Sequence, residues 1–351
     1  MNSSPSSMKQ MNLADASSLV EKLRSQIGSV IFGQDSLVTE SICCFLSGGH
    51  ILMTGAPGLA KTTLVRVIAQ KLGLSFGRVQ FTPDLLPADI IGSEVLNIQQ
   101  ESGKRSFEFV PGPIFVNLVL ADEINRASPR TQSAMLEAMQ ESQVTVGGQV
   151  HHLPSPFMVF ATQNPFESEG TFPLPEAQLD RFLLHSLVEY PQQDDELKIL
   201  AEHANNHLIG EGNFVDQGFK LEQDKIASLI QRTQQIHIKP ELLQLINELV
   251  RSTRPDDELC NRELKPLLWY GAGPRAGISL ISVSRAFALL NQEEHVRWRH
   301  IKRMAKPVLR HRIRLAGHSH NDELTVDKFI EQIIEDLEQR HSQICEGAED
   351  A

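Results

Sequence analysis

The chain has 351 residues, a length that fits one large or two medium-sized domains. Hydrophobic residues make up 41% of the sequence, which is enough to build a core and argues against general disorder. The formal net charge is -11, so the protein as a whole is a poor candidate for binding nucleic acid.

The cysteines and the apolar segments bear on where the protein works. Cys43, Cys44, Cys260 and Cys345 form no C-x-x-C pair and no zinc-ligand cluster with histidines, so we expect reduced and mostly buried thiols. The N-terminus lacks the apolar region of a secretory signal, and the longest apolar runs are far shorter than the roughly 18 residues that span a bilayer. The sequence therefore predicts a cytoplasmic protein with no transmembrane segment.

The predicted elements begin after a Ser-rich segment, residues 1–12, which we expect to be a disordered tail. Residues 14–28 carry apolar side chains at helical spacing, with Gly28 as the stop. From residue 45 to 190, short apolar runs alternate with helical stretches, which predicts βαβ units and a parallel sheet. The clearest predicted strands and the helix between them are residues 50–54, 117–121 and 157–162, and the helix 129–142 with Ser128 as N-cap and Pro129 at its first position.

The strand pattern fades beyond Pro191. We therefore expect an α/β core over residues 13–191, followed by a helical domain over 192–351 that ends in an acidic segment.

A glycine-containing loop between the first predicted strand and a helix has the pattern of a P-loop. Its backbone N–H groups and the helix N-terminus form a cradle for anions. Lys61 would reach the β- and γ-phosphates of ATP, and the Thr62 hydroxyl would ligate Mg²⁺. The nucleotide-binding residues of this loop are Gly55, Ala56, Pro57, Gly58, Leu59, Ala60, Lys61, Thr62 and Thr63.

Ala60 stands where the usual pattern has glycine. Alanine is acceptable there if the residue has helical dihedral angles, but not if the loop needs a positive φ.

Two carboxylates follow the second apolar strand, where the sequence reads NLVLADE. Neighbouring side chains at a strand end point to different sides. Asp122 can therefore face the metal while Glu123 acts as the base for the attacking water. An Asp-Glu pair alone is as well explained by a solvated turn, and it is the P-loop that makes the catalytic interpretation strong.

Asn164 follows the third apolar run and can hold the lytic water against the γ-phosphate. Without the two preceding motifs, an ordinary Asn-Pro turn would be the better explanation.

With these three elements in place, the sequence resembles the MoxR branch of the AAA+ ATPases over roughly residues 28–315. Alanine at position 60 is usual in that branch. The resemblance implies a three-layer P-loop NTPase core with a parallel sheet and an all-helical lid domain. The blocks that carry it are VIFGQ (30–34), TGAPGLAKTTL (54–64), FTPDLLPADIIG (81–92), FVPGPIF (109–115), LADEINRA (120–127), ATQNPFESEGTFPLPEAQLDRFLL (161–184), GPRAGISL (273–280) and VLRHRIRL (308–315).

The same resemblance implies roles for further residues. Asn164 is similar to the sensor-1 residue, Arg181 to an arginine finger that acts on a neighbouring subunit's ATP, and Arg275 to the sensor-2 arginine of the lid. Arg126 is a weaker candidate for another inter-subunit arginine, and a surface salt bridge explains it equally well. The residues that would line the adenine pocket include Val30, Gly33 and Gln34.

Two insertions are typical of the branch. Residues 93–113 resemble the helix-2 insert, a hairpin that would face the pore of a ring. Residues 143–156 resemble the hairpin before sensor 1, and a tight turn at Gly147-Gly148 agrees with that interpretation.

A basic stretch lies between His295 and Arg314 and contains eight Lys or Arg residues and no acidic one. Nucleic-acid binding is one interpretation. Apolar positions recur within the stretch, so a helix-turn-helix with a solvated or inter-subunit face also explains it, and the acidic segment after Asp322 is a candidate partner.

The functional expectation is an ATPase that turns ATP and water into ADP and phosphate. The resemblance implies a ring, most commonly a hexamer, that acts as a chaperone-like remodeller in the assembly of a client complex or the insertion of its metal cofactor. A protein with a von Willebrand factor A domain is an expected partner, and the sequence does not name the client. The alternatives are a DNA-directed AAA+ motor or loader, and a regulatory switch that hydrolyses ATP slowly.

Overall fold

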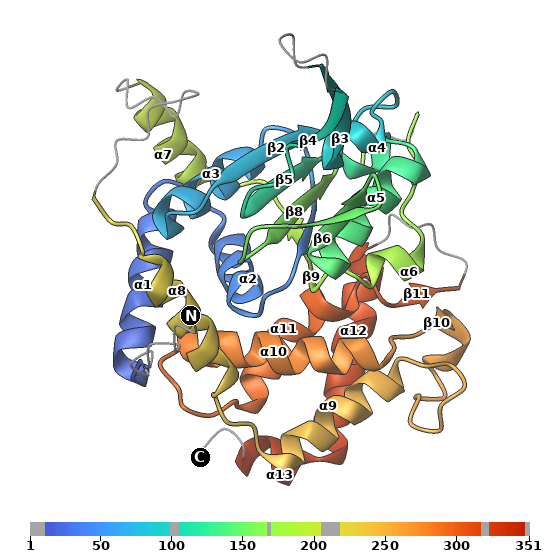
Figure 1. The fold of residues 1–351 in the computed structure, drawn as a ribbon. Helices are drawn as coiled ribbons and strands as arrows, with labels where there is room; N and C mark the ends of the chain where they lie inside the picture. The colour runs from blue at the N-terminus through green and yellow to red at the C-terminus, as the bar shows by residue number, and fades with distance from the viewer. Residues whose placement is uncertain (1–10, 99–104, 167–169, 205–217, 317–322, 348–351) are drawn as a thin grey trace, which may run out of the picture. The chain divides into compact units, whose positions relative to one another are not determined.

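A computed structural model describes residues 11–98, 105–166, 170–204, 218–316 and 323–347 (Figure 1). Nearly all of the predicted N-terminal tail, residues 1–12, lies outside these ranges. No helix in the described ranges is both long enough and apolar enough to cross a membrane. The described cysteines are all buried and form no disulfide, as the sequence predicted.

Packing divides the chain into two compact units. The sheet unit consists of residues 27–41 and 48–218, and the helical unit takes the chain before residue 27, residues 42–47 and the chain from 219 onward. The sheet unit thus includes helix α7 (Gln193–Ala204), and helix α2 (Asp35–Leu46) contributes to both units. The single boundary predicted at residues 191–192 stays a prediction.

The sheet unit is built on five parallel strands in the order β2-β5-β8-β1-β9. Three of them lie within a residue or two of the predicted strands, and β2 and β9 add one strand at each edge. The central strands β1, β5 and β8 are buried along almost their whole length, as expected for parallel strands covered on both faces. The five strands are β1 (Ile51–Gly55), β2 (Phe76–Gln80), β5 (Leu118–Asp122), β8 (Met158–Gln163) and β9 (Leu184–Val188).

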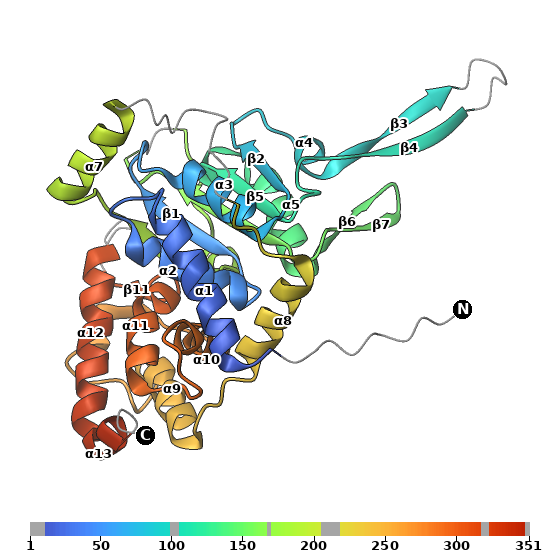
Figure 2. The ribbon, with the colours of Figure 1, turned by 90° about the vertical axis from the view of Figure 1, so that its left-hand side faces the viewer.

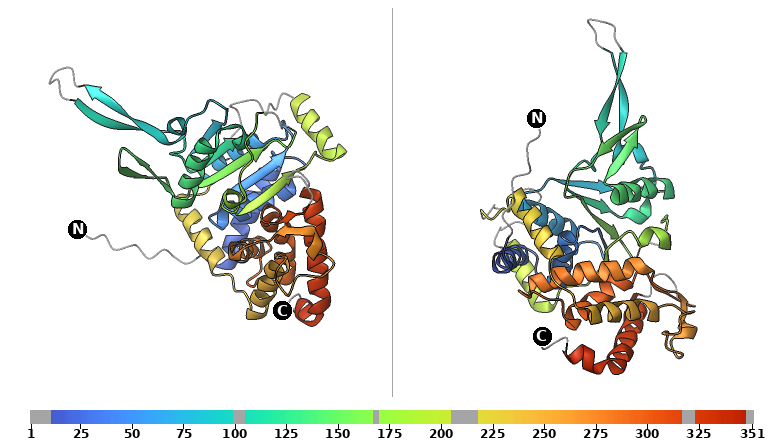
Figure 3. Two further views of the ribbon diagram at one scale, coloured as in Figure 1. Left: turned by 90° about the vertical axis from the view of Figure 1, so that its right-hand side faces the viewer. Right: turned by 60° about the horizontal axis from the view of Figure 1, so that its bottom comes forward.

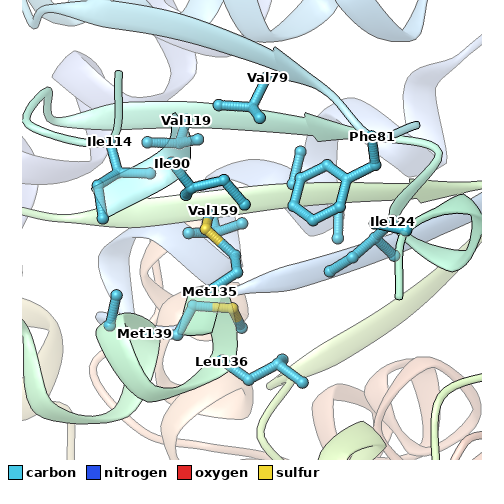
Figure 4. Close-up of a cluster of buried hydrophobic side chains, with 14 of the residues drawn as sticks. Val79, Phe81, Ile90, Ile114, Val119, Ile124, Met135, Leu136, Met139 and Val159 are labelled. Carbon is cyan, nitrogen blue, oxygen red and sulfur yellow. The ribbon is translucent and has the colours of Figure 1, made fainter. Parts of the chain in front are cut away.

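Helices pack against this sheet. Helix α3 (Lys61–Leu72) contacts β2 and β5 and ends at Gly73, which has φ 65°. Helix α5 (Pro129–Glu141) begins as predicted, because the Ser128 side chain accepts a hydrogen bond from the Thr131 N–H at 3.4 Å and Pro129 fills the first position. Its buried face, with Met135, Leu136 and Met139, meets side chains of β2, β5 and β8 in one hydrophobic cluster (Figure 4).

Two hairpins extend from the sheet unit (Figure 2). The first, β3 (Gly92–Ile98) with β4 (Arg105–Pro111), lies in the predicted helix-2 insert; helix α4 (Pro87–Ile91) precedes it, and residues 99–104 fall outside the described ranges. The second, β6 (Gln143–Val146) with β7 (Gln149–His152), turns at two glycines of positive φ, as predicted. The rings of Phe109 and His151 stack with centroids 3.8 Å apart, so side chains of the two hairpins touch. Figure 3 shows that the backbones of both hairpins project on the same side of the sheet unit.

The helical unit contains most of the remaining helices. Helix α10 is central in it, because it contacts α8, α9 and α11. A short antiparallel pair, β10 with β11, was not predicted from the sequence. The elements of this unit are α1 (Leu13–Gly28, of which residues up to 26 belong here), α8 (Gln223–Gln234), α9 (Pro240–Ser252), η2 (Lys265–Leu267), β10 (Leu268–Tyr270), α10 (Pro274–Leu290), α11 (Trp298–Leu309), β11 (Arg314–Leu315), α12 (Glu323–Arg340) and α13 (Ser342–Gly347).

The basic stretch forms helix α11 and then enters strand β11. The second helix of the predicted helix-turn-helix is therefore not formed in this stretch. Its charges face acidic partners on α12: Lys302 lies 3.0 Å from Glu338, and Arg310 lies 2.7 Å from Asp327. Lys306 pairs with a third acid of the same helix. The predicted pairing between the basic stretch and the acidic segment is therefore confirmed.

One buried histidine joins three elements of the sheet unit. His50 precedes β1, and its Nε2–H donates to the carbonyl oxygen of Met139 at 3.0 Å. The N–H of Val159 donates to His50 Nδ1, also at 3.0 Å. Both bonds together require the neutral imidazole with its proton on Nε2. Burial lowers the pKa of His50 to about 4, while the bond to Met139 acts in the opposite direction.

We predict that His50 makes the protein less stable as the pH falls from about 6.5 to about 4. In this window the unfolded chain protonates the histidine, whose ordinary pKa is 6.5, and the folded chain does not. The free energy of unfolding should lose about 3 kcal/mol from this group across the window. Urea unfolding at several pH values measures this free energy. It should depend less steeply on pH in His50→Gln than in wild type, because glutamine does not titrate. His152→Gln, at an exposed position, is the matched control, and parallel curves for wild type and His50→Gln would contradict the prediction.

Candidate functional site

The strand order brings the three predicted motifs to one edge of the sheet. Strands β5, β8 and β1 are neighbours and parallel, so their carboxyl ends lie side by side. Strand β1 leads into the P-loop, β5 ends in Asp122, and Asn164 follows β8. Ligands of open parallel sheets bind at this edge.

The P-loop between β1 and α3 contains backbone conformations that residues other than glycine adopt only with strain. Gly58 has φ 82°, and a side chain at Gly55 would meet the Val188 carbonyl oxygen at 2.5 Å. Ala60 has φ 56° and ψ 18°, so it is left-handed and lacks the helical dihedral angles that would have suited alanine. This conformation costs an L-residue roughly 1–2 kcal/mol, and Ala60 keeps it while its carbonyl oxygen accepts the Leu64 N–H at 2.9 Å.

Lys61 lies over the loop. Its Nζ donates to the carbonyl oxygens of Gly55 at 2.6 Å and of Ala56 at 3.2 Å. Burial lowers the pKa of the Lys61 ammonium, and the nearby charges of Asp122 and Glu123 act in the opposite direction. The cation of the P-loop and the two carboxylates are thus close enough to interact electrostatically.

Asp122 accepts hydrogen bonds on both carboxylate oxygens. The Thr162 hydroxyl donates to Oδ1 at 2.6 Å. Arg78, on the edge strand β2, donates to Oδ2 from Nη2 at 2.7 Å and from Nε at 3.2 Å. Thr162 also accepts the N–H of Glu123 at 2.8 Å, so it fixes both residues at the end of β5.

Glu123 has a left-handed backbone with φ 56°. Its Oε2 accepts one hydrogen bond from Gln80 Nε2 at 2.8 Å and one from Arg126 Nη1 at 2.9 Å. Arg126 belongs to the short helix η1 (Ile124–Arg126) directly after Glu123. The structure thus shows Arg126 in an ion pair within its own chain, the alternative that the sequence left open for it.

Asn164 and the predicted adenine segment are also held in place. Asn164 is 8% exposed, and its Oδ1 accepts the Phe166 N–H at 3.1 Å. Gln34 is buried and donates from Nε2 to the Glu189 carbonyl oxygen at 2.8 Å. Gly33, with φ 70°, lies so close to Pro191 that a side chain would clash there. Val30 lies in the same segment and is half-buried.

The two other predicted arginines belong to other elements. Arg181 follows helix α6 (Glu176–Leu179), and its side chain makes no hydrogen bond or ion pair with another residue of the described ranges. Arg275 is the second residue of α10 and is described only within the helical unit.

Sequence reasoning missed Arg78, Gln80 and Thr162. Gln80 is the register partner of Asp122, and Arg78 lies two residues earlier on the same face of β2. That pairing follows only from the fold, since more than 40 residues separate these side chains from their partners. Thr162 was visible as a polar residue at the end of an apolar run, which was the one available signal.

The residues present fit a nucleotide-bound Mg²⁺. This ion takes one or two protein oxygens and completes its shell with water and phosphate. Thr62 is the second residue of α3, and Asp122 is the last residue of β5, against which α3 packs. No group of three or more His, Cys, Asp or Glu residues that could hold a metal occurs in the described ranges.

Comparison with known proteins identifies the family of the chain. The family model of the "ATPase family associated with various cellular activities (AAA)" matches residues 50–184, and the AAA lid domain model matches residues 264–336. A crystal structure of a candidate ATPase from Cytophaga hutchinsonii superposes with a TM-score of 0.80 at 35% identity, covering 92% of this chain and 95% of that one.

Curated relatives cover nearly the whole chain. YeaC of Bacillus subtilis is 37% identical over 91% of this chain and 94% of its own length. Chaperone MoxR1 of Mycobacterium tuberculosis is 36% identical over 90% of this chain and 81% of its own length. Protein MoxR of Paracoccus denitrificans is 30% identical over 87% of this chain and 91% of its own length. Together with the strand order and the P-loop, these similarities show that the chain belongs to the MoxR family of AAA ATPases.

Proposed function

We propose that this protein hydrolyses ATP to ADP and phosphate and uses the cycle as a chaperone-like remodeller in the cytoplasm. The observation that carries the proposal is that Lys61, at the start of α3, and Asp122 and Glu123, at the end of β5, meet at the carboxyl edge of the sheet, because α3 packs against β5. A cationic P-loop facing two carboxylates is the arrangement that phosphoryl transfer with a metal and a water requires.

The chain's own residues would bind the nucleotide in two places. The backbone N–H groups of residues 55–62 other than Pro57, together with the Lys61 ammonium, hold the β- and γ-phosphates, which replace the loop carbonyl oxygens as partners of Nζ. Residues 30–34 line the adenine pocket. Mg²⁺ bound at Thr62 and Asp122 would neutralise charge on the same phosphates.

Hydrolysis needs a positioned water and a group that takes its proton. The two hydrogen bonds described for the Glu123 carboxylate both end on Oε2, so Oε1 is the oxygen we assign to the proton. Asn164 orients the water. Arg181 and Arg275 stabilise the negative charge that spreads over the γ-phosphoryl oxygens.

The output of the cycle is the finer part of the proposal. One relative is named Chaperone MoxR1, which supports a remodelling role over other uses of ATP. We propose a homo-oligomeric ring, a hexamer, that assists the assembly of a client complex or the insertion of its metal cofactor. A partner with a von Willebrand factor A domain fits this role, and a reading frame for such a protein beside this gene would support it.

A DNA-directed motor is the alternative, and the pairing of α11 with α12 counts against it. Three cationic side chains of the basic stretch are bound to carboxylates of α12. Arg297 and Arg299 pair with Glu293, and Arg312 is buried. Phosphates of a duplex would have to displace these partners.

We predict that Glu123→Gln keeps ATP binding and slows hydrolysis by about 10²–10⁴-fold, because the amide keeps the shape of the side chain but takes no proton. Binding of a fluorescent ATP analogue and release of phosphate measure the two effects separately. Lys61→Ala is the control, since it should lose binding and hydrolysis together. Wild-type turnover in Glu123→Gln would remove Glu123 as the base.

We predict that the protein binds no DNA duplex with submicromolar affinity at physiological salt, because the basic stretch is neutralised within the chain. A fluorescence anisotropy titration at two salt concentrations tests this. Tight binding that weakens steeply with salt would instead favour the DNA-directed alternative.

We predict that Arg181 acts on the neighbouring subunit. Arg181→Ala should bind ATP normally and lose about 10³–10⁵-fold in hydrolysis, the range for arginine fingers of other P-loop enzymes. Glu123→Gln subunits keep the finger but have inactive sites, whereas Arg181→Ala subunits keep the site but lack the finger. Mixed rings should therefore recover activity at interfaces that join an intact site to an intact finger. No recovery despite demonstrated co-assembly would place Arg181 in its own site or make it structural.

A further inference from the structure

Arg78 forms a contact that the catalytic scheme does not use. It lies on the edge strand β2 with a side chain that is 48% exposed, while Asp122 is 15% exposed. Two of its nitrogens converge on Asp122 Oδ2, at 2.7 and 3.2 Å. The Thr162 hydroxyl donates a hydrogen bond to the other carboxylate oxygen, Oδ1, at 2.6 Å. The carboxylate assigned to the metal is therefore already neutralised by a cation from the same chain.

The charges around Asp122 extend this observation. Arg126 pairs with Glu123 at 2.9 Å, and Lys61 begins helix α3, which packs against the strand that ends in Asp122. The site thus combines three cationic side chains, Lys61, Arg78 and Arg126, with two anionic ones, Asp122 and Glu123. A divalent cation without a nucleotide would meet a site with excess positive charge.

ATP changes this balance, because its triphosphate brings several negative charges to the P-loop. An added cation is repelled before the phosphates arrive and attracted afterwards. Arg78 is the cation best placed to control this change, since it reaches Asp122 from an exposed edge strand and can withdraw into solvent.

We propose that Arg78 is a placeholder cation on Asp122 that suppresses binding of free divalent metal until a nucleotide supplies its phosphates. Arg78 acts on the metal through Asp122 and is a positioning residue, not a catalytic one. The inference rests on the proposed role of Asp122 as the metal-binding carboxylate.

The test is a titration of the nucleotide-free protein with Mn²⁺, followed by the electron paramagnetic resonance signal of the free ion. Arg78→Gln removes the charge and keeps a hydrogen-bond donor, so it should bind Mn²⁺ roughly three- to tenfold more tightly than wild type. Arg78→Lys keeps the charge and should stay close to wild type. Arg130→Gln, which removes the same charge at an exposed position on α5, should leave the affinity unchanged.

Thermal unfolding provides a second readout. Without metal, Arg78→Gln leaves the two carboxylates with less compensation, so its melting temperature should fall and Mn²⁺ should restore more of it than in wild type. Unchanged Mn²⁺ affinity in Arg78→Gln would overturn the inference. Weaker affinity would overturn it too, because Arg78 would then orient Asp122 for the metal.

A separate measurement distinguishes failure of this inference from failure of the proposed function. Binding of a fluorescent ADP analogue is measured with and without Mg²⁺ in wild type and in Asp122→Asn. If Mg²⁺ strengthens binding in wild type but not in Asp122→Asn, the metal assignment stands, and the Arg78 titration decides the inference alone. Identical Mg²⁺ dependence in both proteins would remove Asp122 as the metal-binding residue, and with it the premise of the Arg78 inference.

Discussion

The negative charges of two adjacent carboxylates at the end of a buried strand have to be compensated by nearby cations and hydrogen-bond donors. The structure of the site depends on which residues supply that compensation. Asp122 and Glu123 repel each other where the solvent is partly excluded, which is costly unless cations or donors are near. The balance comes from residues of other elements: Arg78 and Gln80 on β2, Thr162 on β8, Arg126 on η1 and Lys61 on α3. Four other elements must therefore be placed correctly around the end of β5 before the two acids are stable together.

The pairing of β2 with β5 sets this placement. Gln80 is opposite Asp122, and Arg78 is opposite Leu120, so both polar side chains lie on the face of Asp122. Val79, between them, points into the cluster that α5 covers. A shift by one residue would turn Arg78 toward that apolar cluster and Val79 toward the carboxylates, because the side-chain period of a strand is two. The burial of Val79 and the compensation of the Asp122 charge therefore favour the same register between β2 and β5.

Much of this was predictable from the sequence. The motifs gave the P-loop and the two carboxylates, and apolar runs gave the three central strands, because those strands are buried on both faces. The edge strands were missed since their sequences are mixed: β2 carries Arg78 and Gln80, and β9 carries His185 and Ser186. These polar residues of β9 form hydrogen bonds with Thr54 and Glu40, partners more than 100 residues away, which no local pattern reveals.

The backbone of the site was the part hardest to predict. Ala60 and Glu123 are two of the four non-glycine residues with positive φ in the described ranges, and both stand at a turn that leaves a strand for a helix. Such strain persists only where surrounding bonds determine the conformation. The Glu123 N–H is held by Thr162, and the Ala60 carbonyl oxygen accepts the first hydrogen bond of α3. Glycine at position 60 would relieve the strain, but it would also give the unfolded loop more conformational freedom to lose on folding. Alanine can therefore serve at this position, because the helix that follows already fixes its backbone conformation.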